Sequence, residues 1–190
     1  KGFDSNSGAL SVTGNNNFSA QNTVLSGEAG RNNVGTLLGG NLNVTQGNLS
    51  VTGTSHHYSS GSFRGLKANG LNLTVSSGSL SLTGKSVAYE GRGPQSGAVA
   101  GLELINTCLS ASSASLTGSS VDSGSGFILN NVTLNATSGN VSLSANVAYG
   151  NALVVTGGGI TAGQDITLNG TATGGSGTAV SLTGMNMNAT

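Results

Sequence analysis

The sequence has very little charge. Only 6% of its 190 residues are charged, and six Lys and Arg residues balance six Asp and Glu residues. Proteins that bind nucleic acids need clustered positive charge, and so do segments that bind anionic membranes. We therefore exclude nucleic acid as a partner, and we expect no electrostatic anchoring to a lipid surface.

Cysteine is almost absent as well. Cys108 is the single cysteine, so the chain cannot form an internal disulfide. A catalytic thiol needs an activating base close by, and both histidines, His56 and His57, lie far away in the sequence. We therefore expect Cys108 to be a small buried side chain.

Helical signals are also missing. No segment shows a 3.6-residue apolar period, and the common residues Gly, Thr, Asn and Val disfavour helix. No apolar run approaches the roughly 18 residues of a membrane-spanning helix, and the first residues do not show the pattern expected of a signal peptide. These absences indicate an all-β chain.

What the sequence does contain is strict alternation. In GLNLTVSSGSLSLTG (70–84), Leu71, Leu73 and Val75 alternate with polar residues, and Leu80 and Leu82 do so after a Ser-Ser-Gly corner. Period-two alternation is typical of β-strands, whereas a disordered Gly- and Ser-rich linker needs no such order. The stretch therefore predicts two short strands joined by a corner.

The same pattern recurs along the chain. It appears again in NLNVTQGNLSVTG (41–53), GLELINTCLSASSASLTG (101–118), NVTLNATSGNVSLSA (131–145) and GITAGQDITLNG (159–170). A fixed period with alternating strands inside each unit is the signature of a solenoid. We predict an all-β fold, a right-handed parallel β-helix (β-solenoid) with three strands per coil and about 25–34 residues per coil.

Aligning the repeats predicts which residues stack on each other. The alignment pairs Leu73 with Leu104, pairs Leu82 with Leu116, and places Leu10 in the same sheet as Leu49. It directs Asn43, Asn72 and Glu103 outward on one face. We expect residues 1–190 to form a single β-helix segment, a piece of a much longer filamentous protein, with adhesive strand edges at its ends.

One phase of the repeat is irregular. Segments 15–33, 54–65 and 85–97 vary in length, and they shorten to 119–126 and 146–151 in later coils. These equivalent segments of the repeat hold seven of the twelve charged residues and all three tyrosines. Because the coils are stacked, we expect equivalent segments of successive coils to form one edge. Tyr and Arg are favoured at binding hot spots. The predicted binding edge comprises His56, His57, Tyr58, Arg64, Tyr89, Glu90, Arg92 and Tyr149.

A plainer interpretation of this edge stays open. Tyrosines at corners often cover the rim of a core, and charges in loops often serve only to keep a β-protein soluble.

Catalytic and metal-binding patterns are not evident. Parallel β-helices include polysaccharide-cleaving enzymes, but glycoside hydrolysis needs two well-placed carboxylates. Only Glu90 and Asp122 lie in neighbouring coils of one phase. His56 and His57 lack further metal ligands, and TGKS (83–86) lacks the spacing of a phosphate loop. We therefore predict no enzyme activity, no catalytic residue, no metal and no cofactor.

The repeat resembles a known family. NVTLNATSGNVSLSA, GLNLTVSSGSLSLTG and DITLNG resemble the filamentous-haemagglutinin repeats of large Gram-negative exoproteins, over about Gly8 to Thr190. These exoproteins are the secreted partners of two-partner secretion systems, and they include the effectors of contact-dependent growth inhibition. The same alternation also occurs in self-associating autotransporter passenger domains.

The resemblance implies a location and a role. It implies a secreted filament on the cell surface, exported through the outer-membrane transporter of a two-partner secretion system. In growth-inhibition effectors a central segment binds a receptor on the target cell, so the expected partner is an outer-membrane protein or the lipopolysaccharide of a neighbouring bacterium. The alternatives are a host-directed adhesin or structural filament shaft and, third, a carbohydrate-active β-helix enzyme.

Overall fold

The computed structural model describes residues 8–30, 33–57, 62–88, 98–121, 124–175 and 177–190. These residues form strands, turns and bends, and none of them belongs to a helix long and apolar enough to cross a membrane. The strands are β1 (Gly8–Val12), β2 (Asn15–Phe18), β3 (Asn22–Ala29), β4 (Val34–Val44), β5 (Asn48–His57), β6 (Ser62–Val75), β7 (Ser79–Ala88), β8 (Ala98–Ala111), β9 (Ser113–Ser120), β10 (Ser125–Ala136), β11 (Val141–Tyr149), β12 (Leu153–Ala162), β13 (Ile166–Gly174), β14 (Val180–Thr183) and β15 (Asn186–Ala189).

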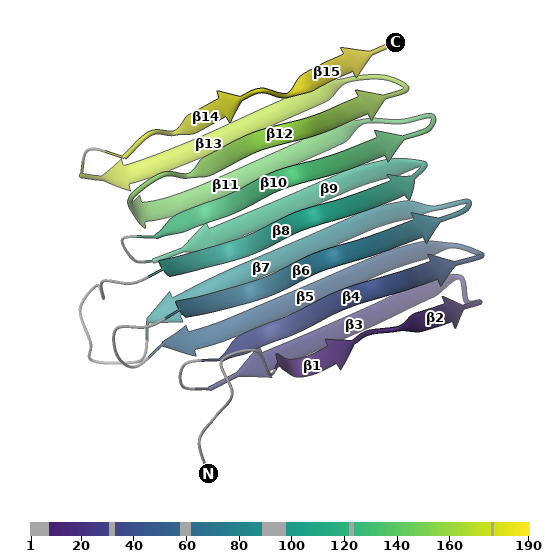
Figure 1. Ribbon diagram of the computed structural model, residues 1–190, viewed down its shortest axis with the longest axis horizontal. Coiled ribbons are helices and arrows are strands. Elements are labelled where there is room, and N and C mark those ends of the chain that lie inside the picture. The colour runs from purple at the N-terminus through teal and green to yellow at the C-terminus, as the bar shows by residue number, and fades with distance from the viewer. Residues whose placement is uncertain (1–7, 31–32, 58–61, 89–97, 122–123, 176) are drawn as a thin grey trace.

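The strands form two parallel sheets that the chain visits in turn (Figure 1). Sheet A contains β1, β2, β4, β6, β8, β10, β12, β14 and β15, and sheet B contains β3, β5, β7, β9, β11 and β13. Each strand pairs with strands of neighbouring coils, because a parallel partner must come from the next turn of the chain. The predicted parallel β-helix is confirmed.

Each long strand of sheet A is interrupted by a residue with positive φ, and β12 by two, Gly157 and Gly158. Such backbone suits Gly and, less often, Asn. These residues divide sheet A into a first arm before them and a second arm after them, so each coil has three extended segments, as predicted. Register places Gly70, Asn106, Asn131, Gly157 and Gly184 in one column, whereas a register shift in β4 pairs Gly40 with Leu71.

The predicted register is correct in sheet B from β5 to β13 and wrong in part of sheet A. Leu82 pairs with Leu116 as predicted, but Leu73 pairs with Leu109, and Leu104 pairs with Ala68. The error arose because the residue with positive φ in this coil is Asn106 rather than a glycine. The residues LELI therefore lie in the first arm, although GLEL resembles the start of a second arm.

The first coil also differs from the prediction. Leu10 lies in sheet A, where it pairs with Thr36, and not in the sheet of Leu49. The reason is that β2 and β3 occupy most of segment 15–33, which the sequence indicated as an irregular loop. Paired residues are 25 to 34 positions apart in sheet B, as predicted, and up to 36 apart in sheet A, between Leu73 and Leu109.

Cys108 is exposed, contrary to the prediction. It lies in the second arm of β8, between the buried Thr107 and Leu109. Alternation therefore directs its side chain outward, into a column that continues Asn72 of β6 and precedes Thr133 of β10.

Two columns of glycine bring the sheets into direct backbone contact. A Cβ atom on Gly53 would collide with the carbonyl oxygen of Gly65, and one on Gly84 with that of Gly101. The main core of Leu, Val, Ile and Ala is closed on this side mainly by glycine, with Ala145 between Gly118 and Gly170 in the sheet B column. The columns are Gly27, Gly53, Gly84, Gly118 and Gly170 in sheet B and Gly35, Gly65, Gly101 and Gly126 in sheet A.

A smaller buried group lies outside the main core. Its apolar members are Ala29, Val34, Phe63, Val99 and Ala100. Ser55, Ser86 and Ser120 form a buried column of sheet B two positions beyond its glycines. This group mixes apolar side chains with hydroxyl groups, unlike the main core.

The glycine contact is tested by Gly84→Ala. The added methyl group has no room against the backbone of Gly101, so overpacking should lower the free energy of unfolding by about 1–3 kcal/mol. The control is Gly30→Ala, where a Cβ meets no atom within 4 Å. Equal urea midpoints for the two variants would contradict the proposed contact.

Adjacent residues of β8 test the inward alternation. Leu104 is fully buried, whereas Ile105 is only partly buried. Leu104→Asp should lower the free energy of unfolding by several kcal/mol, because it places an unpaired charge in the core. Ile105→Asp should cost much less in the same thermal melt, and the reverse order would show that the strand faces the other way.

Candidate binding edge

The connections that vary most in length all leave the ends of sheet B strands. They run from three residues (150–152) to nine (89–97), whereas those at the opposite corner run from one (112) to four (137–140). Because the strands are parallel and stacked, the strand ends from which these connections leave lie along one edge, here called the loop edge. The predicted irregular segment 15–33 is an exception, because it contains β2 of sheet A and β3 of sheet B.

His56 lies on this edge, near the end of β5. Its Nε2 atom is 2.9 Å from Oε1 of Glu28 in the neighbouring strand β3. The His56 side chain is 30% exposed and that of Glu28 is 73% exposed. An exposed pair of this kind contributes little to stability, so both groups stay accessible to a partner. His57 follows at the end of β5, in register with Ala88.

Arg64 lies near the start of β6 and is largely enclosed. Its Nε atom is 2.8 Å from Oε2 of Glu103 in β8, with side chains only 13% and 9% exposed. Its Nη1 atom also donates a hydrogen bond to the carbonyl oxygen of Phe63. Glu103, expected to be an ordinary outward residue, is therefore part of a nearly buried ion pair beside the loop edge.

Tyr149 ends β11 and is 45% exposed. Its ring lies beside Gly174 of β13, where a Cβ atom would come within 2.9 Å of the ring. Register through β9 and β7 connects Val147, two residues before Tyr149, to Ser55, two residues before His57, three coils away. At the usual strand spacing the two positions are about 14 Å apart along the edge.

The other predicted residues, Tyr58, Tyr89, Glu90 and Arg92, lie outside the described residues. Their strands β5 and β7 end side by side, with His57 paired to Ala88. Contact between Tyr58 and Tyr89 stays a prediction.

The sequence analysis missed the Arg64–Glu103 pair and the glycine columns. The glycines could have been found from the sequence, because Thr-Gly follows an inward apolar residue in three successive repeats: VTG (51–53), LTG (82–84) and LTG (116–118). The ion pair carries none, since its partners are far apart in the sequence.

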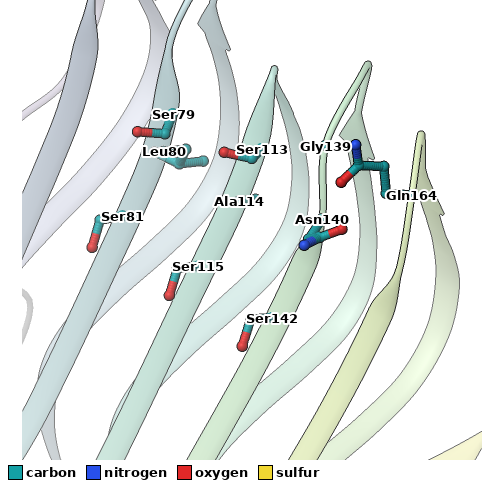
Figure 2. A pocket seen from close by; sticks show the side chains of 10 residues that line it. All are labelled: Ser79, Leu80, Ser81, Ser113, Ala114, Ser115, Gly139, Asn140, Ser142 and Gln164. Carbon is teal, nitrogen blue, oxygen red and sulfur yellow. The ribbon is translucent and has the colours of Figure 1, made fainter.

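A groove lies at the other end of the sheet B strands, away from the loop edge. This groove has a volume of about 410 Å³ (Figure 2). None of the residues that line it is charged: Ser79, Leu80, Ser81, Ser113, Ala114, Ser115, Gly139, Asn140, Ser142 and Gln164. Across the described part of the chain, no three His, Cys, Asp or Glu residues come together as metal ligands.

No family model, curated protein or solved structure matches this chain. The fold and the surface therefore carry the functional argument.

A double-mutant cycle tests the ion pair. Arg64→Met should leave Glu103 without its partner and lower the free energy of unfolding by about 2 kcal/mol or more. Adding Glu103→Leu should recover much of that loss, because no charge then stays buried. Strictly additive urea midpoints would show that the two side chains do not interact.

Proposed function

We propose that this chain is a non-enzymatic, surface-exposed binding segment of a secreted filamentous exoprotein. It recognises a receptor on a neighbouring bacterial cell, an outer-membrane protein or lipopolysaccharide, after export through the transporter of a two-partner secretion system. One observation supports this most: the β-helix gathers its variable connections on a single edge. Binding residues commonly lie on loops held by a rigid scaffold.

The loop edge suits a large partner. Six sheet B strands in succession span about 24 Å from first to last. Its exposed groups include an aromatic ring at Tyr149 and the His56–Glu28 pair. Tyr and Arg are the residues that most often dominate binding energy, and the sequence adds Tyr58, Tyr89 and Arg92 to the same edge.

The chemistry of arginine indicates which chemical groups of the receptor this edge would bind. A guanidinium binds phosphate and carboxylate through paired hydrogen bonds, and lipopolysaccharide cores carry such groups. Arg64 is largely enclosed and paired with Glu103, so the proposal assigns the receptor contact to Arg92 and gives Arg64 a supporting role.

The absence of enzyme activity belongs to the same proposal. The described carboxylates Glu28, Glu103 and Asp165 belong to different strands or corners, and Glu103 is paired with Arg64. This arrangement does not resemble the two facing carboxylates of a glycosidase.

A structural filament shaft is the second candidate. It is favoured by the uncharged outer columns of sheet B, such as Ser50, Ser81, Ser115 and Ser142. A shaft needs only coil-to-coil stacking, so its function would not depend on the residues of the loop edge.

Replacing Tyr58, Tyr89 and Arg92 with Ala separates the two candidates. A binding edge should lose about 2 kcal/mol or more of binding energy, roughly 30-fold in affinity for target cells. The measurement is adherence of the purified segment to whole bacteria, with the thermal midpoint recorded in parallel to confirm folding.

The matched control changes three residues of the second arm. Asn43, Thr74 and Asn135 occupy one outward column of sheet A, and their replacement by Ala should leave adherence unchanged. Loss of adherence only in this control set would place the receptor surface on sheet A. Unchanged adherence in both sets would favour the shaft.

A further inference from the structure

The corner between the second arm and sheet B carries a ladder of amide side chains with a gap. Successive coils place in this column Asn22, Asn48, Ser79, Ser113, Asn140 and Asp165. The Asn48 amide donates to Oδ1 of Asn22 at 3.1 Å, and Oδ1 of Asn48 accepts from the backbone N–H of Ser79. Oδ1 of Asn140 accepts from the N–H of Asp165 in the same way. Each asparagine thus connects two coils, but two middle rungs carry serine.

The groove lies at these two rungs. Ser79 and Ser113 line it on one side, and the amide groups of Asn140 and Gln164 line the far end (Figure 2). Figure 2 also shows Ser81, Ser115 and Ser142 side by side on neighbouring strands. Since the groove crosses three strands, it runs along the coil axis for about 10 Å. Its volume of about 410 Å³ is in the range of small-ligand sites, roughly 300–1,000 Å³.

The chemistry of the groove restricts its ligand. Strands β7, β9 and β11 are each paired on both sides, so the sheet has no free backbone edge for an added peptide strand. No cationic side chain lines the groove to hold a phosphate or carboxylate. What it offers is hydroxyl and amide groups, which donate and accept hydrogen bonds without charge; the side chains of Leu80 and Ala114 are buried in the core beneath them.

We propose that this groove binds a short neutral oligosaccharide lying along the coil axis. Sugar hydroxyl groups both donate and accept, as serine hydroxyls and side-chain amides do. The site lies at the opposite end of the sheet B strands from the loop edge. It therefore does not depend on the receptor assigned to that edge.

The test is an NMR titration of the folded chain with neutral hexasaccharides. The probes are cellohexaose, maltohexaose and chitohexaose at millimolar concentration, with hexagalacturonate as the acidic counterpart. At least one neutral sugar should shift the backbone amide signals of Ser81, Ser115 and Ser142, and hexagalacturonate should not. Absence of shifts with all three neutral sugars, or shifts spread evenly over both sheets, overturns the proposal.

A variant that places an asparagine in the serine gap of the ladder tests the groove directly. Ser113→Asn extends the amide ladder into the groove, so it should reduce sugar affinity at least tenfold while the chain stays folded. The control Ser50→Asn changes the same column as Ser81, one coil outside the groove, and should bind like the parent. Undiminished binding by Ser113→Asn overturns the proposal.

A second variant tests the groove independently, in case Ser113→Asn does not fold. Ser115→Val removes a groove hydroxyl with a residue that strands favour, and it should also weaken binding. The triple Ala variant of the loop edge separates the two sites, because it should lose adherence to target cells yet keep the sugar-induced shifts.

Discussion

The structure depends on backbone hydrogen bonding between successive coils. Each strand of one coil pairs in parallel with its equivalent in the next, so residues of one phase must form straight columns. Leu82 over Leu116 in the core and Ser81 beside Ser115 on the surface follow from this single constraint. The same pairing satisfies the backbone of a chain that has little charge and one cysteine to stabilise it otherwise.

Glycine sets the shape of the cross-section. Residues with positive φ, such as Gly70 and Asn106, divide each sheet A strand into two arms. Elsewhere Gly84 and Gly101 let the two sheets touch through their backbones. The main core is thus enclosed by two arms of sheet A and by sheet B, and a small mixed group lies beyond the glycine contact. That group packs beneath the strand ends from which the connections of the loop edge leave.

The loop edge and the groove arise from two different irregularities of the repeat. The loop edge arises where connections lengthen, as between Ala88 and Ala98, and this does not disturb the stacking of the strands. The groove arises where small residues, Ser79 and Ser113, replace the asparagines of a ladder. Both irregularities occur in the middle coils, so the strand end from which the longest connection leaves and the neutral groove lie at opposite ends of sheet B.

The sequence by itself determined the parallel β-helix and the register of sheet B from β5 to β13. Alternation and period suffice for these, because they depend on each strand's own pattern. Only the tertiary structure decided that Leu73 lies beside Leu109, that Cys108 faces outward and that Arg64 pairs with Glu103. The physical reason is that the coil between β6 and β8 is longer than its neighbours. A longer coil changes which residues of neighbouring strands are paired. Packing between the coils, rather than any local sequence pattern, determines that pairing.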